Sequence, residues 1–554
     1  MDVENLVVRL ATAPDDVDLV QLLAKAQLGK HLVQIAALAK RQSRANLTLL
    51  TEVQSTAPQV FRGLLLDPGI VAGARRDTGP LAAAAAIAAR VPATVGVDLR
   101  HGEVTLPTLG TIRFPLSSNR FHRESATIHV DVQDGRTAVS TTAAGVVVEL
   151  PDDLTTPTAS WQPLPRIAVG HTAHLNLTLA TDGPLADVYG APEIFRSHSL
   201  DDWQQAIGAG WRLLEAERPG HAAALAAGLR TIVPIPAEPN GDATSCTIDG
   251  MFGAVYMSFP EDPASAAVTL VHEFQHAKLA AALDIAVLYT KNDEAAHYAP
   301  WRGDPRPLGA LLQGVYAHLG VAQFWGTHRT TAHENALRAD TEFARWRDDT
   351  WQACQGIVGD PAFTDVGRAF VEALAAELNR LRKEPVQVAA AELAERITLD
   401  HAVSWRLRNF AVDPHAATQI AAAWLAQEQP DLPPVDSLVQ RTPQPREISA
   451  VRTQLMYCRM AGTLRPGTDA DADLLCALGS YEQARDAYAD RIHRDPDDLD
   501  AWAGLALSVP PHDPARHSLR TIPEVVAGSY RQATLLGSVD PEPVELARWL
   551  AQAT

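Results

Sequence analysis

The segment TLVHEFQHAKLAAALDI, residues 269–285, carries the clearest structural signal in this sequence. It is mostly apolar, but it holds two histidines four residues apart and a glutamate directly after the first histidine. Asp262 and Pro263 precede it, and a capping residue followed by proline is typical of a helix start. We therefore expect a long helix, on which His272 and His276 stand one turn apart on the same face.

On either side of this helix, the pattern of apolar and polar residues changes several times along the chain. Residues 1–92 carry apolar positions at helical spacing and predict two to four helices. From residue 93 to about 190, β-branched and polar residues alternate, and RHGE (100–103) and QDGR (133–136) are turn signals, which predicts a small antiparallel β region. Helical patterns resume over 191–428, which we expect to be the catalytic domain that contains the histidine helix.

The last part of the chain is set off by proline. Residues 429–447 are proline-rich and predict a linker to a C-terminal helical region over 448–554. Within that region, residues 477–507 have the layout of a tetratricopeptide unit, but a solenoid normally needs about three such units. A partner-binding surface and a plain packing domain both remain open for this tail. The expected fold class is α+β: mostly helical, with a small antiparallel β section in the first half and a helical-repeat-like C-terminal region.

The bulk composition excludes several classes of protein. The 554 residues carry a net charge of −19, with no basic stripe, which argues against a nucleic-acid partner. The longest apolar run, residues 79–91, is well short of the about 20 residues that a membrane span needs. We expect no membrane association and a cytoplasmic location. The cysteines are widely spaced, which argues against a disulfide framework and against a cysteine zinc site: Cys246, Cys354, Cys458 and Cys476.

Two histidines leave a metal site incomplete, so the third ligand decides the chemistry. The extended metzincin pattern requires Gly and His where this chain has Leu279 and Ala282, which excludes that class. Glu294 lies eighteen residues after His276 and could complete a zinc site. In that zinc peptidase, Glu273 would act as the general base on a metal-bound water.

A second candidate for the third ligand is His318. It is the only histidine of an apolar helix that we expect over 306–326. The small residues Gly314 and Ala322 on the same stripe would let that helix approach another closely. We expect the remaining histidines of this region to lie at the surface: His297, His328 and His333.

The connector YAPWRGDPRPLG, residues 298–309, lies between the two expected helices. Its prolines restrict the backbone and would hold Arg302 and Arg306 in defined places. A guanidinium group matches a carboxylate with two hydrogen bonds, so either arginine could bind an acidic ligand. The alternative is an ordinary salt bridge, for example with Asp304.

We expect the catalytic pocket to lie between the two helices, above strands within residues 228–259. Ser245 and Ser258 flank those strands. Their hydroxyls could reach a ligand carboxylate or could satisfy loop backbone.

Taken together, residues 265–326 resemble the α-ketoglutarate–HExxH-type peptide β-hydroxylases, HExxH-motif proteins of bacterial ribosomal-peptide pathways. The resemblance extends more loosely upstream through SCTIDGMFGAVYMSF, residues 245–259, and does not cover the first 190 or last 120 residues. It implies an iron(II)- and 2-oxoglutarate-dependent oxygenase that uses dioxygen to hydroxylate the β-carbon of a residue, such as aspartate, in a ribosomally made precursor peptide.

The resemblance also implies roles for individual side chains. Arg302, with Arg306 as second choice, would bind a carboxylate of 2-oxoglutarate or of an acidic substrate residue. Glu273 would orient a ligand histidine, or bind iron itself, instead of serving as a base. Open positions on the metal would receive 2-oxoglutarate and dioxygen. The iron would be held on one face by three imidazoles, those of His272, His276 and His318.

Two other functions stay open at this stage. One is a zinc metallopeptidase with Glu294 as third ligand. The other is a non-catalytic scaffold that binds a precursor peptide or a partner through its helical tail. Other peptide-modifying enzymes are further expected partners.

Overall fold

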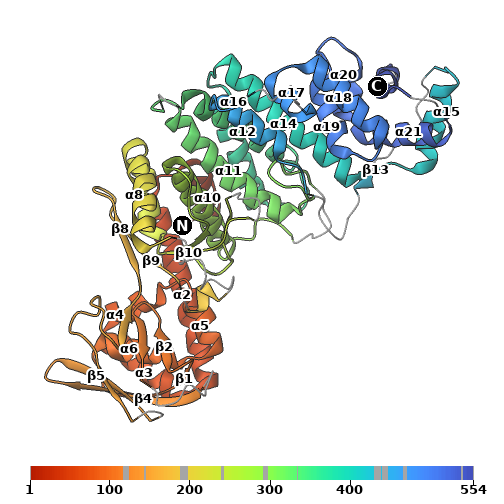
Figure 1. The fold of residues 1–554 in the computed structure, drawn as a ribbon. Helices are drawn as coiled ribbons and strands as arrows, with labels where there is room; N and C mark the ends of the chain where they lie inside the picture. Colours follow the sequence, from red (N-terminus) through yellow and green to blue (C-terminus); the bar gives the residue numbers. More distant parts are fainter. Residues whose placement is uncertain are drawn as a thin grey trace. The chain divides into compact units, whose positions relative to one another are not determined.

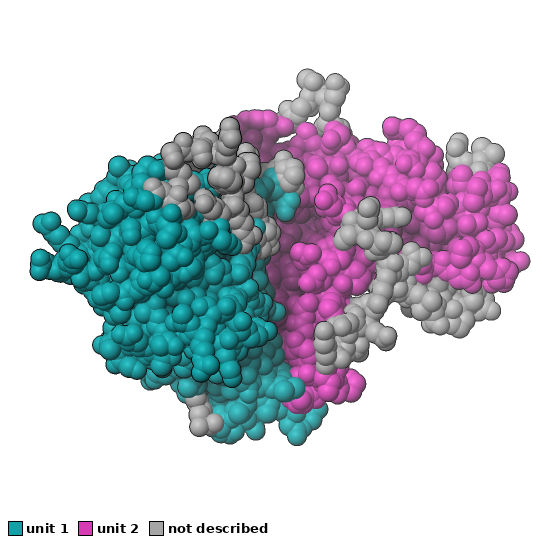
Figure 2. All heavy atoms as spheres, turned by 90° about the horizontal axis from the view of Figure 1, so that it is seen from below, with its two compact units in different colours: residues 1–288, 365–370 teal, residues 289–364, 371–554 magenta. Residues whose placement is uncertain are grey.

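The protein is described from a computed structural model, in which the chain forms two compact units, coloured separately in Figure 2. Unit 1 comprises Met1–Leu288 with Asp365–Phe370, and unit 2 comprises Tyr289–Thr364 with Val371–Thr554. The expected catalytic domain, 191–428, therefore contributes residues to both units. The structure describes residues 2–115, 124–142, 145–181, 183–187, 198–238, 243–290, 297–332, 335–429, 438–439, 447–465, 471–537 and 541–552.

The fold class is α+β, as expected, and unit 1 opens with helices (Figure 1). Residues 3–89 form six helices, whereas the sequence predicted two to four. The sequence predicted too few helices because successive helices follow each other almost without a loop. Ser43 ends one helix and caps the next, where its hydroxyl accepts a hydrogen bond from the Asn46 N–H, and Pro58 begins another helix. The helices are α1 (Val3–Thr12), α2 (Val17–Gln42), α3 (Arg44–Thr56), α4 (Pro58–Leu65), α5 (Ile70–Arg76) and α6 (Gly79–Ala89).

Two antiparallel sheets follow, as the alternating pattern predicted. The first has the order β1-β4-β5-β6 and the second the order β2-β3-β7. Both predicted turns are present: His101 and Gly102 have φ of 52° and 79°, and Asp134 and Gly135 have φ of 50° and 79°. Two consecutive left-handed residues are the pattern of a tight hairpin turn. The strands are β1 (Ala93–Leu99), β2 (Glu103–Leu106), β3 (Gly110–Arg113), β4 (Glu124–Gln133), β5 (Arg136–Thr141), β6 (Val147–Glu149) and β7 (Trp161–Pro163).

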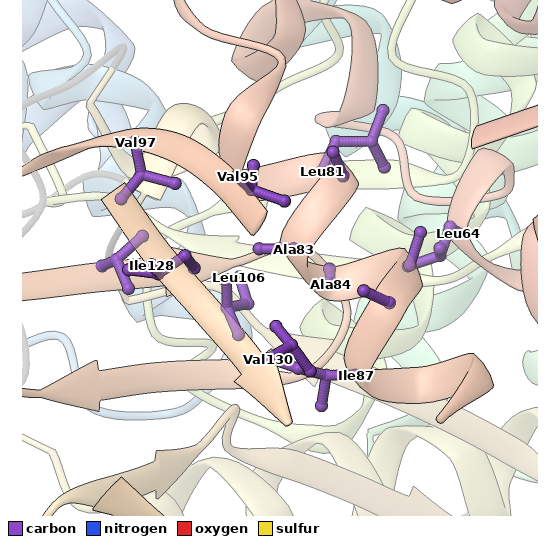
Figure 3. Packing of buried hydrophobic residues seen from close by; sticks show 14 of the residues in the cluster. Leu64, Leu81, Ala83, Ala84, Ile87, Val95, Val97, Leu106, Ile128 and Val130 are labelled. Atoms are coloured by element: carbon purple, nitrogen blue, oxygen red, sulfur yellow. The ribbon is translucent and has the colours of Figure 1, made fainter. Parts of the chain in front are cut away.

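The core of this part is built around α6, which is alanine-rich and buried on all sides (Figure 3). Ala83 and Ala84 lie among side chains of β1, β2 and β4 in Figure 3, including Val95 and Ile128. Helix and sheet approach so closely that a Cβ added at Gly79 would lie 2.0 Å from the carbonyl oxygen of Gly96. Small residues here therefore set the distance between the layers.

A third sheet is mixed, which the sequence did not predict. Its order is β11-β12-β10-β9-β8, with β9 parallel to β10 and β10 parallel to β12. Two of its strands were expected to continue the antiparallel region, but helices between β9 and β10 provide the crossover that parallel pairing requires. The elements are β8 (Arg166–Val169), β9 (Leu175–Leu179), α7 (Gly183–Ala186), α8 (Leu200–Glu217), α9 (Pro219–Gly228), β10 (Thr231–Pro234), β11 (Ser245–Cys246), β12 (Ala254–Met257) and α10 (Pro263–Leu283).

Unit 2 is almost entirely helical over the residues that the structure describes. The α11 helix packs on α12, and α12 packs on α14. The first six residues of α13 belong to unit 1. The elements are α11 (Leu308–His328), α12 (Ala336–Gln355), α13 (Asp365–Arg382), α14 (Val388–Asn409), β13 (Phe410–Ala411), α15 (Pro414–Leu425), β14 (Leu438–Val439), α16 (Val451–Met460), α17 (Ala472–Leu478), α18 (Tyr481–Arg494), α19 (Leu499–Ser508), α20 (Ala515–Thr521), α21 (Pro523–Leu535) and α22 (Pro543–Leu550).

The segment with tetratricopeptide-like layout forms the expected helices. Gly479, with φ of 87°, ends α17, and α18 ends before Pro496. The Tyr488 ring packs so tightly on α19 that a Cβ at Gly504 would lie 2.1 Å from it. Assignment to the repeat family stays a prediction. Most of the predicted linker, 430–437 and 440–446, lies outside the described residues.

Two expectations about the chain as a whole can be compared with the structure. All four cysteines lie in described ranges, and none of them is in a disulfide bond. Across the described ranges, none of the helices has both the length and the apolar character that crossing a membrane requires.

Candidate metal site

The predicted histidine helix is present as α10, and its start follows the sequence signals. The Asp262 carboxylate accepts a hydrogen bond of 2.7 Å from the Ser265 N–H, and Pro263 is the first helical residue. The helix packs closely on α8, where a Cβ at Gly210 would lie 2.6 Å from the Ala266 Cβ. Packing and capping together fix the direction in which the α10 side chains point.

The two histidines of α10 bring their Nε2 atoms together. These atoms are 3.2 Å apart, and the rings are nearly perpendicular at 81°. Two imidazoles bound to one ion at about 2.0–2.1 Å place their nitrogens about 3.0–3.4 Å apart. The same distance suits a hydrogen bond between the rings when one Nε2 carries a proton. His272 and His276 thus have the spacing of two ligands of a single metal ion.

Glu273 is a buried carboxylate whose two oxygens are both held. Only 1% of the residue is exposed, and Oε1 accepts a hydrogen bond of 2.7 Å from the Ser245 hydroxyl. Oε2 lies 2.7 Å from Thr247 Oγ1, which is also 2.9 Å from the Glu273 backbone oxygen. Oε1 is 3.9 Å from His272 Nε2. A carboxyl group held in one place therefore lies beside the histidine pair.

The two hydroxyls that hold Glu273 differ in how the sequence revealed them. Ser245 was a candidate for a ligand or a loop contact, and the structure places it on Glu273. Thr247 was missed, although residues two apart on an extended segment share one face. Ser258 has the loop role, because its Oγ accepts a hydrogen bond of 3.0 Å from the Thr244 N–H.

Burial also changes ionisation further along α10. It lowers the pKa of Lys278 to about 7, with a further lowering by the Arg218 charge, which Asp15 and Asp16 oppose. Burial, Arg218 and Lys278 hold the pKa of His221 well below its ordinary value. Lys278 on α10 and His221 on α9 therefore carry less positive charge than the sequence suggests.

In unit 2, the predicted second helix is present as α11, and His318 is buried on it with 7% of its surface exposed. Its Nδ1 lies 2.9 Å from the Gly314 carbonyl oxygen. A carbonyl can only accept, so Nδ1 carries the proton of this bond, and the neutral ring has its lone pair on Nε2. Metal-bound histidines usually have this arrangement.

The His318 ring lies between two indoles that sequence reasoning missed. Its centroid is 4.1 Å from that of Trp301 and 4.7 Å from that of Trp346, and both pairs are stacked. Gly314 makes room for this arrangement, because a Cβ there would lie 2.5 Å from Trp301. Its small size thus serves the indole contact. No periodic signal marks either tryptophan, since the stack depends on tertiary packing.

Arg302 and Arg306 both form a salt bridge with Asp304, which the sequence analysis gave as the alternative to ligand binding. The Arg302 Nε and Arg306 Nη1 atoms lie 3.0 and 2.9 Å from the two carboxylate oxygens. Burial alone would raise the pKa of Asp304, but the bonds from Arg306 and Arg302 lower it below its usual value. Both arginines nevertheless retain further N–H donors, so binding of a ligand carboxylate stays a prediction.

The other candidate residues of this region have mixed outcomes. Glu294 and His333 lie outside the described residues. His297 and His328 are not simply at the surface, because both are half-buried. His297 is 3.8 Å from Asp360, and burial lowers its pKa while Asp360 opposes that shift. His328 stacks on Phe324 at the end of α11.

The predicted ligands do not all belong to one unit. His272, Glu273 and His276 are in unit 1, and Arg302, Arg306 and His318 are in unit 2. Among the residues that the structure describes, no three or more His, Cys, Asp or Glu side chains gather closely enough to hold a metal ion. The three-histidine ligand set therefore stays a prediction.

Comparison with known proteins adds no assignment. No protein-family model matches the chain, and no curated protein matches it. The resemblance within residues 265–326 therefore rests on those residues alone.

Proposed function

We propose that this protein is a cytoplasmic iron(II)- and 2-oxoglutarate-dependent oxygenase. Its substrate would be a ribosomally made precursor peptide, in which it hydroxylates the β-carbon of a residue such as aspartate. The observation that carries the proposal is the 3.2 Å separation of the Nε2 atoms of His272 and His276. The pair lies on a capped, well-packed helix and has the spacing that one shared ion requires.

The donor set fits ferrous iron, because imidazole suits iron as well as zinc. When bound, iron with 2-oxoglutarate and dioxygen supplies the oxidising power for hydroxylation of a C–H bond. His272 and His276 would hold the metal, and His318 is the proposed third ligand. The hydrogen bond from its Nδ1 to the Gly314 carbonyl oxygen fixes the ring orientation and places a proton on Nδ1, as in most metal-bound histidines.

Glu273 has a positioning role in this proposal. The Ser245 and Thr247 hydroxyls hold its carboxylate, so its charge stays at one place, 3.9 Å from His272 Nε2. A fixed carboxylate favours one orientation and one protonation state of the neighbouring imidazole. Arg302, which is 53% exposed at its side chain, would bind a carboxylate of 2-oxoglutarate with donors that Asp304 leaves available.

The decisive experiment is anaerobic reconstitution of the purified chain with ferrous iron. 2-Oxoglutarate and air are then added, and succinate is measured with and without candidate peptides. We expect succinate to form, and peptide mass to rise by one oxygen atom with a true substrate. His272→Ala and His276→Ala should abolish iron retention, and His318→Ala should reduce it strongly. His415→Ala, an exposed histidine at the start of α15, is the matched control and should retain iron.

The same experiment separates the proposal from its alternatives. A zinc-loaded protein that cleaves peptides and forms no succinate would instead identify a metallopeptidase. In that case Glu273→Gln should abolish cleavage, because a base would have been lost. Peptide binding with neither iron retention nor cleavage would identify a scaffold.

A further inference from the structure

A basic cavity lies in the C-terminal helical part of unit 2. It has a volume of about 470 Å³ and is formed by the loop before α20 and by α20 itself. It is wide open to solvent, so a ligand bound there would stay partly exposed. Its wall includes Pro511, His512, Arg516, His517 and Arg520. The cavity is unrelated to the histidine helix, and nothing in the proposed oxygenase chemistry uses it.

Two arginines of this cavity are poorly satisfied. Their side chains are only 25% and 22% exposed, yet the one carboxylate that pairs with them among the described residues is Glu395. Its Oε1 is 3.8 Å from Arg516 Nη2 and 3.6 Å from Arg520 Nη1, whereas a charge-assisted bond is about 2.7–2.9 Å. Arg520 Nε is buried and has no hydrogen-bond partner within the described residues. A guanidinium N–H in this state is a donor that an added acceptor can satisfy.

Arg548, in the same helical region, is an arginine that is fully paired with a carboxylate. Arg548 binds Asp513 with contacts of 2.8 and 3.2 Å. Asp513 lines the cavity and also accepts a bond of 2.9 Å from the Ala515 N–H. Its charge is thus committed to Arg548 and does not neutralise Arg516 or Arg520.

The local charge balance of the cavity is positive. Burial lowers the pKa of Arg520 to about 10, and the charges of Arg516 and Arg396 lower it further, against the opposing effect of Glu395. Glu395 is 66% exposed at its side chain, so water screens much of its charge. The excess of positive charge is confined to this cavity, because the chain as a whole has a net charge of −19.

We propose that this cavity is a binding site for an oxyanion. Arg516 and Arg520 are four residues apart on α20, so their guanidinium groups lie on one face and can reach the same group. Glu395 illustrates the chemistry, since a single oxygen of it lies near both guanidiniums. The ligand supplies the oxyanion as a phosphate group or as the carboxylates of an acidic peptide, and it competes with Glu395 for the two arginines.

The test is calorimetric titration of the full chain with two probes, inorganic phosphate and a capped tetra-aspartate peptide. Chloride is adjusted so that ionic strength is equal throughout, because general attraction is screened equally at equal ionic strength. We expect Arg516→Gln and Arg520→Gln each to weaken binding at least tenfold. Glu395→Gln should tighten it several-fold by removing the competitor. Arg494→Gln removes an exposed charge from α18 and should have no effect.

The outcomes distinguish the sources of the anion. Binding of phosphate alone assigns a phosphoryl ligand, and binding of the peptide alone assigns a carboxylate ligand. If either glutamine variant unfolds, Arg516→Lys and Arg520→Lys keep the charge but lose the fork, and should bind more weakly than wild type. The proposal is overturned if neither probe binds, or if the arginine variants bind as wild type does. Neither result bears on the proposed oxygenase activity.

Discussion

At the scale of single residues, the histidine motif gains its meaning from the groups around Glu273. The motif itself specifies only that two imidazoles and a carboxylate share a helix. The structure adds that the carboxylate is buried and bound by hydroxyls from β11 and the residue just beyond it. A carboxylate held in this way has little freedom to move, which suits orientation of a neighbour better than repeated proton transfer.

The hydroxyl contacts of Glu273 can be removed one at a time. We expect Ser245→Ala and Thr247→Val each to destabilise the protein by about 1–3 kcal/mol, because each leaves a buried acceptor with one bond fewer. If Glu273 orients a metal ligand, iron affinity should also fall about 10–100-fold. Equilibrium dialysis with ferrous iron measures this. Ser258→Ala is the control, since that serine binds backbone. Unchanged affinity in both variants would contradict the positioning role.

The buried carboxyl group of Asp67, between α4 and α5, leads to a prediction about pH. Burial raises its pKa to about 6 from 3.8, despite a hydrogen bond of 2.7 Å from the Gly69 N–H. The raised pKa means that the folded state binds the proton more tightly than the unfolded state. This contribution is full below about pH 4 and is lost as pH rises through about 6.

Asp67→Asn mimics the protonated acid and should remove that dependence. The stability of wild type relative to Asp67→Asn should fall by up to about 3 kcal/mol between pH 4 and pH 7, at about 1.4 kcal/mol per pKa unit. Urea unfolding of unit 1 at a series of pH values measures the difference. A constant difference across this range would show that Asp67 is ionised normally.

At the scale of elements, the sequence predicted the two helices of the candidate site well, but it predicted the number of N-terminal helices and the parallel strand pairing poorly. The boundaries expected for α11 were 306–326, and the helix spans Leu308–His328, because its apolar stripe is a local property. The pairing of β9 with β10 joins segments about fifty residues apart in the sequence, and no local pattern encodes it. The Trp301–His318–Trp346 stack escaped prediction for the same reason. The hydroxyl contacts of Glu273 were predictable in part: Ser245 was a candidate, and Thr247, two residues further on the same extended segment, lies on the same face.

The α11 helix offers a test of close packing around His318. Gly314→Ala would place a Cβ 2.5 Å from the Trp301 ring, so the indole must move. We expect unit 2 to be destabilised by about 1–3 kcal/mol, as in other overpacked sites. Denaturant unfolding followed by circular dichroism measures this change.

Gly528→Ala in α21 is the matched control for that substitution. Its added Cβ would meet Val412 and Ala417 at 3.8 and 3.9 Å, which is ordinary contact. For this substitution we expect the free energy of unfolding to rise by up to about 1 kcal/mol, because alanine has a better helix propensity than glycine. If the two substitutions change the free energy of unfolding equally, the Trp301 indole can move aside without destabilising the fold.

At the scale of the whole molecule, the division into two units bears on the proposed ligand set. His272 and His276 belong to unit 1 and His318 belongs to unit 2. Two compact units are expected to give two thermal transitions in the absence of metal. A metal that binds only the folded form raises the stability of whatever it binds, by about 2.7 kcal/mol at a concentration 100 times its Kd.

Calorimetry with and without ferrous iron therefore reports on the third ligand. If His318 completes the site, iron should raise both transitions by a few degrees, and His318→Ala should confine the shift to the unit 1 transition. Iron that raises only the unit 1 transition in wild type would remove His318 from the ligand set. If neither transition moves, the proposed iron site is wrong.

The buried alanine helix α6 has a consequence for how the chain is made. The ribosome synthesises residues 79–89 before residues 124–133, so this apolar helix emerges before β4, one of the strands that pack on it. A nascent or truncated chain that ends before Gln133 therefore exposes apolar surface to water and to other copies. Expression of such a fragment should yield more aggregate than expression of a fragment that includes β4.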